Sequence, residues 1–162
     1  MGIEIERRFL VRSGALPARL PHGARLLQGY LGFAPLVRVR TVRPLRNGKD
    51  RAYLTVKGTG TRIRAEFEYP IPLRDATALL ALCGSMTIQK VRRRIGPWEL
   101  DCYEGRHAGL WLAEIELSRP DQPLPDPLPD WIGPEVTDDP RYTNSRLARL
   151  KRWPPRWAIH GG

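Results

Sequence analysis

The sequence is poor in the residues that build disulfides and zinc sites, with two cysteines and three histidines among 162 residues. Two cysteines do not make the disulfide framework of a small secreted domain, and no cysteine or histidine pair has metal-ligand spacing. There is also no run of about 18 apolar residues and no apolar stretch near the N-terminus, so we expect no membrane span and a cytoplasmic protein.

Acidic residues are less frequent than basic residues in this chain. The chain has 27 Lys and Arg against 17 Asp and Glu, which gives a net charge of +10 and a pI near 10.4. Such a balance favours an anionic partner, such as a phosphate compound or a nucleic acid. Hydrophobic residues make up 41% and charged residues 27%. This composition and length predict one globular domain over residues 1–162.

Apolar and charged residues alternate with period two in segment after segment, a pattern that predicts β-strands with two different faces. In the first segment Glu4, Glu6 and Arg8 share a face, and in a later one Arg64, Glu66 and Glu68 do. We expect about eight strands, within residues 3–11, 26–31, 37–40, 52–58, 62–69, 89–95, 98–103 and 111–117.

Other segments have different patterns. Residues 73–84 predict an amphipathic helix that ends near a glycine. Residues 118–134 are rich in proline and lack periodicity, so we expect a loop there. A basic helix is expected from about residue 144, followed by a tail that its prolines keep from being helical.

The charged face has two interpretations. Alternation arises most often because one face of an antiparallel sheet meets solvent. Here, however, Glu-x-Glu pairs occur three times, basic residues also come in pairs, and Ser and Asn are scarce between them. If the strands close into a barrel with the apolar face outward, the charged face lines the interior. Such a lumen must hold water and ions that balance its charges.

The paired charges suit a particular chemistry. Glu-x-Glu on a strand places two carboxylates on one side, about 6.5 to 7 Å apart, so neighbouring strands can build an oxygen site for Mg²⁺ or Mn²⁺. Arg and Lys pairs at the same spacing can bind successive phosphoryl groups. The sequence therefore favours a metal and polyphosphate site.

The opening EIERRFL resembles the ExExK signature of the CYTH superfamily, also called triphosphate tunnel metalloenzymes. The resemblance extends through QGYL, VRVR, YLTVKG, EFEYPIP, KVRRR, WELD, GLWLAEIEL and EVTDDPRYTNSRL, and so covers nearly the whole chain. One departure is Arg8, where the signature usually has lysine. A planar guanidinium there retains the positive charge but not the size or proton chemistry of an ammonium.

The resemblance implies a mainly β, α+β fold: an eight-stranded antiparallel closed barrel, or tunnel, with flanking helices. Mapped by motif, the expected metal ligands are Glu4, Glu6, Glu66, Glu68, Asp101, Glu114 and Glu116. Glu66 and Glu68 either hold a second metal or orient basic neighbours. The expected phosphate ligands are Arg8, Arg38, Arg40, Lys57, Arg64, Lys90, Arg92 and Arg94. Direct catalytic roles are expected for Glu4, Glu6, Lys90 and Arg92.

The function so implied is hydrolysis of a triphosphate with Mg²⁺ or Mn²⁺, most economically inorganic tripolyphosphate. Alternatives within the same architecture are a class IV adenylyl cyclase and a nucleoside or thiamine triphosphatase. A polyphosphate- or RNA-binding protein is the non-enzymatic alternative, although repeated Glu-x-Glu would repel a nucleic-acid backbone. We expect a small triphosphate compound as the partner rather than a nucleic acid or membrane, and a homodimer is possible.

Overall fold

A computed structural model describes residues 2–60 and 62–151 of the chain. The expected tail beyond Lys151 lies outside the described residues. Within them, the strands are β1 (Gly2–Val11), β2 (Ala24–Phe33), β3 (Leu36–Pro44), β4 (Arg51–Lys57), β5 (Ile63–Pro70), β6 (Thr87–Ile95), β7 (Trp98–Tyr103), β8 (Trp111–Glu116) and β9 (Ile132–Glu135). The helices are α1 (Leu73–Leu82) and α2 (Asn144–Arg149), with short 3-10 turns η1 (Ser13–Ala15), η2 (Gly105–His107) and η3 (Pro140–Tyr142).

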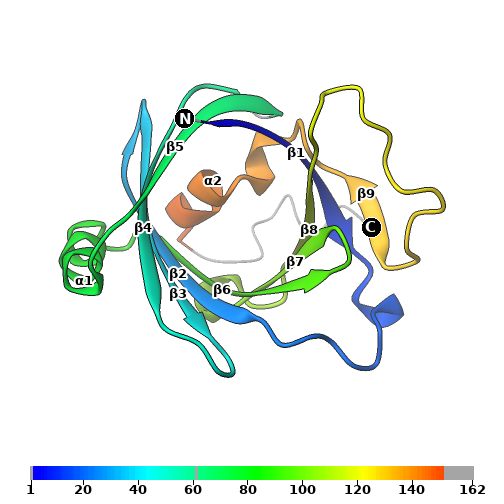
Figure 1. Ribbon diagram of the computed structural model, residues 1–162, viewed down its shortest axis with the longest axis horizontal. Helices are drawn as coiled ribbons and strands as arrows, with labels where there is room; N and C mark the ends of the chain where they lie inside the picture. Colours follow the sequence, from blue (N-terminus) through cyan, green and yellow to red (C-terminus); the bar gives the residue numbers. More distant parts are fainter. Residues whose placement is uncertain (1, 61, 152–162) are drawn as a thin grey trace.

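Eight of the described strands close into an antiparallel barrel, which confirms the predicted fold (Figure 1). The order around the barrel is β5-β4-β3-β2-β6-β7-β8-β1, and β5 pairs again with β1. Closure uses the first half of β1, where Glu4 lies opposite Arg64. The second half of β1 pairs with β8 on one side and with the short β9 on the other.

Strand β9 corrects the expectation of a loop through residue 134. It spans four residues and contains Gly133 and Pro134, so the sequence carries no alternating pattern that would mark it. Proline lacks a backbone N–H and is tolerated mainly on edge strands, and β9 is an edge strand that pairs only with β1 among the described strands. Helix α1 and the start of α2 lie where the sequence predicted them.

The apolar faces of the strands point out of the barrel and are covered there. Phe9, Trp98 and Ile115 belong to a buried cluster that includes Trp131 of the 118–134 segment. On the opposite side, α1 packs over β2, β3 and β4 (Figure 1). It comes so close to β2 that a Cβ on Gly29 would lie 2.6 Å from the sulfur of Cys83. Because the apolar faces of the strands pack against the elements outside the barrel, their charged faces line the lumen.

One end of the lumen is different. There the inward residues of the strands are apolar and form a second buried cluster that contains Tyr30, Ile88, Tyr103 and Leu112. Leu147 of α2 is fully buried in this cluster, and α2 lies across the lumen in the view down the barrel (Figure 1). The helix therefore fills one end of the tunnel. None of the described helices is long and apolar enough to cross a membrane.

Candidate functional site

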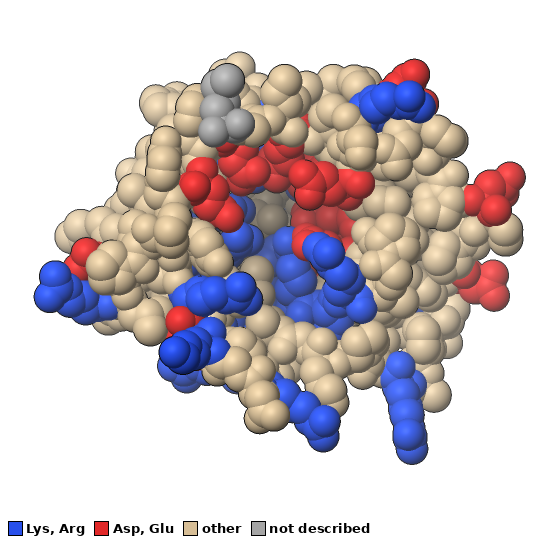
Figure 2. All heavy atoms as spheres, in the orientation of Figure 1, with Lys and Arg blue, Asp and Glu red and all other residues tan. Residues whose placement is uncertain are grey.

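A cavity of about 200 Å³ occupies the remaining lumen. Seen from its open side, acidic residues gather along one rim of the hollow and basic residues along the opposite inner wall (Figure 2). Among the described residues, seven carboxylates and seven cations line it. The acids are Glu4, Glu6, Glu66, Glu68, Glu99, Glu114 and Glu116, and the bases are Arg8, Arg38, Arg40, Lys57, Arg64, Lys90 and Arg92.

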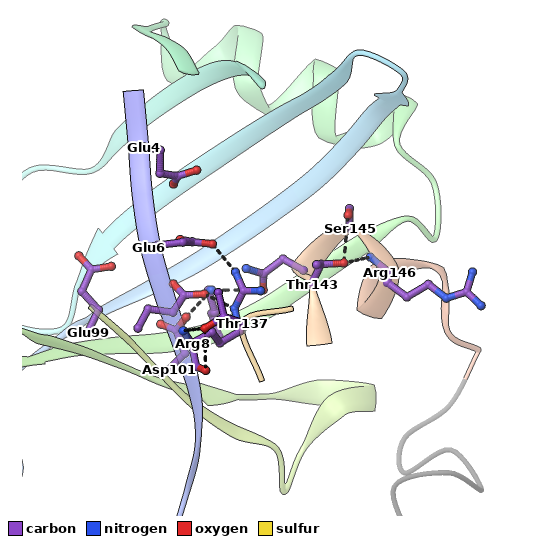
Figure 3. Close-up of polar contacts among 12 residues, drawn as sticks. Glu4, Glu6, Arg8, Glu99, Asp101, Thr137, Thr143, Ser145 and Arg146 are labelled. Atoms are coloured by element: carbon purple, nitrogen blue, oxygen red, sulfur yellow. Dashed lines mark hydrogen bonds and ion pairs between the residues drawn. The ribbon is translucent and has the colours of Figure 1, made fainter. Parts of the chain in front are cut away.

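The acidic wall is built by strand register. Glu6 of β1 lies opposite Glu116 of β8, and Glu114 of β8 lies opposite Glu99 of β7. Because side chains alternate along each strand, Glu4 and Glu6 project to the same side of β1 (Figure 3). Carboxylates from three adjacent strands thus face one space, as the Glu-x-Glu pattern predicted.

Arg8 lies within this acidic wall and is almost fully buried. Its Nε donates to Glu114 Oε1 at 2.9 Å, and its Nη2 donates to Glu6 Oε1 at 2.5 Å. Burial opposes the charged form of Arg8, but Glu114 and Glu6 outweigh it and raise its pKa. The guanidinium is therefore a fixed positive charge that joins two carboxylates of different strands.

The pKa values of the acids reflect how well each is paired. Burial would raise the pKa of Glu114, but Arg8 and Arg92 lower it well below the usual value. Burial and repulsion from Glu114 raise the pKa of Glu6. The Glu116 side chain makes no hydrogen bond or ion pair with any described residue, and burial followed by repulsion from Glu4 and Glu99 raises its pKa. Near Glu116 the acidic wall therefore carries negative charge that the neighbouring bases do not fully compensate.

Asp101 does not reach the cavity, although the sequence placed it among the metal ligands. Its side chain is fully buried behind Lys90 and Arg92. Lys90 Nζ donates to it at 2.5 Å, and Arg92 makes two hydrogen bonds of 2.7 Å with its two oxygens. The short aspartate faces inward, but the longer side chains of β6 extend over it. Asp101 therefore anchors Lys90 and Arg92, two cations of the basic wall.

Arg38 and Arg40 of β3 extend the basic wall. Both donate to Glu68 of β5, at 3.2 Å from each Nη2 to Oε2. The Nε atoms of both arginines are nevertheless buried without a hydrogen-bond partner. Burial and repulsion from Arg38 lower the pKa of Arg40 to about 10. Unpartnered donors and crowded positive charge are the features of a site that accepts an anion.

Two further bases complete this wall. Lys57 donates to both oxygens of Glu4 at 2.8 Å and lies 3.2 Å from Glu66. Arg64 donates to Glu4 at 2.6 Å. Burial would raise the pKa of Glu4, but Lys57 and Arg64 lower it.

Arg94 is the second predicted residue that the structure does not bring to the cavity. Its side chain is 75% exposed and pairs with Glu99 at 3.0 Å, near the end of β6. Arg62, which precedes β5, also lies outside the cavity and pairs with Asp138 at 2.7 Å. Alternation predicts the face of a strand on which a residue lies, but not its depth along the tunnel.

Several lining residues were not predicted, namely Glu99, Gln28, Tyr30, Leu36, Thr143, Asn144 and Ser145. Glu99 shares the alternation of its strand and could have been found by it. Tyr30 accepts a hydrogen bond from Gln28 at 2.9 Å, and burial raises its pKa to about 12. The three residues from α2 and its N-cap carry no pattern that would mark them as lining the lumen.

The donor set fits a divalent cation. Hard carboxylate oxygens are the preferred ligands of Mg²⁺ and Mn²⁺, and the raised pKa of Glu116 arises in part from acids that a cation would compensate. In the structure as it stands, no three His, Cys, Asp or Glu side chains of the described residues gather closely enough to hold a metal ion. Most of these carboxylates pair with bases instead.

The fold and cavity define a class of protein: a closed antiparallel tunnel that carries a row of cations on one wall and a row of carboxylates on the other. No protein-family model matches the chain. The chain is 44% identical over 155 residues to an inorganic triphosphatase of Acetivibrio thermocellus, covering 92% of this chain and 95% of that protein.

A second relative is an inorganic triphosphatase of Nitrosomonas europaea, 32% identical over 152 residues, with 90% of this chain and 96% of that protein covered. The crystal structure of the inorganic triphosphatase NE1496 superposes with a TM-score of 0.63 at 29% identity, over 94% of this chain and 98% of the other. The chain therefore belongs to the inorganic triphosphatase family.

Proposed function

We propose that this protein hydrolyses inorganic triphosphate with Mg²⁺ or Mn²⁺, and that its family forms part of the CYTH or triphosphate tunnel metalloenzyme superfamily. The observation that carries the proposal is the division of one cavity into an acidic and a basic wall (Figure 2). A basic wall alone would serve a binding protein. The carboxylates opposite it are what metal-assisted phosphoryl transfer requires.

Charge balance supports the need for a metal. The seven acids and seven bases that line the cavity within residues 2–60 and 62–151 cancel one another. A triphosphate chain brings several negative charges into this neutral space, and buried charge without compensation is costly. Divalent cations among the acids would restore the balance. Binding of the two ligands is therefore expected to be mutually dependent.

Glu4, Glu6, Glu114 and Glu116 are the residues that would hold the cation, with Glu66 and Glu99 beside them. When bound there, the metal supplies a Lewis acid for phosphoryl oxygens and lowers the pKa of a water molecule. Glu68 contacts Arg38, Arg40 and Thr55, so we assign it an orienting role.

The bases bind and orient the phosphate chain. Arg38 and Arg40 offer unpartnered Nε–H groups, and Arg64 and Lys57 can exchange Glu4 for a phosphoryl oxygen. Lys90 and Arg92 keep their positions when substrate leaves, because Asp101 behind them holds both. Arg8 donates to both Glu6 and Glu114, so we assign it two roles: it fixes the spacing of these carboxylates and it contributes to phosphate binding. The attacking group is water, so no side chain acts as nucleophile.

The lining favours an inorganic substrate over a nucleotide. Tyr30 and Leu36 are the two large apolar side chains among the described lining residues, and Tyr30 is almost fully buried. A nucleobase or thiamine ring needs a stacking surface or matched hydrogen-bonding groups, and charged side chains occupy most of the wall. A cytoplasmic location and a homodimer stay predictions from the sequence.

The deciding experiment incubates the purified protein with tripolyphosphate or ATP, each with Mg²⁺, Mn²⁺ or EDTA, and separates the products. We expect phosphate and pyrophosphate from tripolyphosphate, loss of turnover in EDTA, and much slower release of ADP from ATP. Cyclic AMP from ATP would identify a cyclase instead. Binding of tripolyphosphate without any turnover in either metal would identify a binding protein and refute the proposal.

A further inference from the structure

Asn144 occupies the closed end of the tunnel, where the charged lumen meets the apolar cluster around Leu147. It is the first residue of α2, and it lines the cavity together with Thr143 and Ser145. A phosphate chain that enters from the open side cannot pass this helix. Whatever phosphoryl group reaches α2 is therefore the end of the chain.

The orientation of the Asn144 amide is fixed by two donors. Tyr103 Oη donates to Asn144 Oδ1 at 2.6 Å, and Lys90 Nζ donates to the same oxygen at 3.3 Å. An ammonium group can only donate, so the amide atom that faces Lys90 must be the oxygen. The Nδ2 group, with two N–H donors, makes no hydrogen bond with any described residue and is left for a ligand.

The helix is held firmly enough to present this amide at a defined place. His107 Nε2 lies 2.7 Å from the carbonyl oxygen of Leu147, and Arg106 donates to the carbonyl of Ala148 at 2.6 Å. Thr143 caps the N-terminus by accepting from the N–H of Arg146 at 3.3 Å, and Arg146 points away from the cavity (Figure 3). Packing, carbonyl contacts and the cap all resist displacement of α2.

We propose that Asn144 is a substrate-binding residue that donates its amide N–H groups to the terminal phosphoryl group at the closed end of the tunnel. Phosphoryl oxygens accept hydrogen bonds and match these donors. Lys90, which shares Asn144 Oδ1, supplies the neighbouring positive charge. This inference rests on the proposed function for the identity of the ligand, and it adds the residue that recognises the end of the chain.

The test measures the dissociation constant of tripolyphosphate by calorimetry in EDTA, so that it does not require turnover. Asn144→Asp retains the oxygen that Tyr103 and Lys90 contact but loses both donors. Asn144→Ala loses donors and oxygen without adding charge. Asn47→Asp, at the other asparagine of the chain and exposed in a loop, is the matched control. We expect each Asn144 variant to bind about tenfold or more weakly, and Asn47→Asp to bind like the parent protein.

Each alternative has its own signature. If Asn144→Asp alone weakens binding, the effect is the added negative charge, and the inference is wrong. If Asn144→Ala alone weakens it, Asn144 only positions Lys90, and the inference is again wrong. Circular dichroism checks that the variants fold, and Asn144→Leu, which has similar volume and no donor, replaces alanine should that variant unfold. Tight binding by the parent protein together with no turnover in either Mg²⁺ or Mn²⁺ would refute the hydrolytic function and leave this inference to be decided by the variants.

Discussion

Replacing Asp101 with asparagine removes one negative charge from between the buried Lys90 and the partly buried Arg92 and leaves the shape of the side chain unchanged. Asp101 and Lys90 are at most 1% exposed, and Arg92 donates to both oxygens of Asp101. Breaking a buried ion pair by removing one partner costs about 3–5 kcal/mol. For a chain of this length that loss lowers the unfolding temperature by about 6–20 °C.

The matched control is Asp50→Asn, the same substitution in the exposed pair with Arg43, for which the expected loss is under about 1 kcal/mol. Differential scanning calorimetry of both variants in EDTA gives the comparison. Asp101→Asn should also raise the KM for tripolyphosphate, because Lys90 and Arg92 lose the group that holds them. Equal, small shifts for the two variants would show that Asp101 does not anchor the basic wall.

Three further predictions concern the two walls. Glu4→Gln combined with Glu6→Gln should abolish metal-dependent turnover while the far-UV circular dichroism stays unchanged; turnover near the parent rate would remove β1 from the active site. Arg40→Ala should lower kcat/KM for tripolyphosphate by about tenfold or more, since a charge-assisted contact is lost, and unchanged kinetics would exclude Arg40. Glu116→Gln should raise the unfolding temperature slightly at neutral pH without metal, because the raised pKa means that the folded state disfavours the charged carboxylate, and solvent screens much of this effect at an exposed side chain. That gain should disappear as the pH falls through the folded-state pKa, and Mg²⁺ should reduce it; a gain independent of pH and of metal would contradict the assignment.

The sequence predicted the walls of the tunnel well because a closed antiparallel barrel translates alternation directly into inside and outside. Whether a charged residue points into or out of the barrel follows from its odd or even position along the strand, which we call its parity. Depth does not, because it depends on strand tilt and on the lengths of neighbouring side chains. Arg94 therefore lies beyond the cavity although it has the parity of Arg92, and Asp101 is covered by the longer side chains of Lys90 and Arg92.

The end of the tunnel was not predictable in the same way. Helix α2 has six residues, and its Leu147 and Ala148 are buried while Asn144 and Ser145 line the cavity. So short a helix offers too little periodicity to indicate which side faces the lumen. Its position depends on contacts with residues far away in the chain, such as the one between His107 and Leu147.

The pairing within the cavity explains how such a concentration of charge can remain folded and yet bind ligands. Glu4 accepts hydrogen bonds from Lys57 and Arg64, so these charges compensate one another within the tunnel. On the proposed function, a phosphate chain would compete with Glu4 for these two bases. The released carboxylate would then be available to a cation, and by linkage a bound cation would strengthen phosphate binding by the same factor. Mg²⁺ should therefore tighten tripolyphosphate binding in the parent protein and do so much less after Glu4→Gln. An equal effect of Mg²⁺ on both proteins would mean that the salt bridges of Glu4 only stabilise the fold.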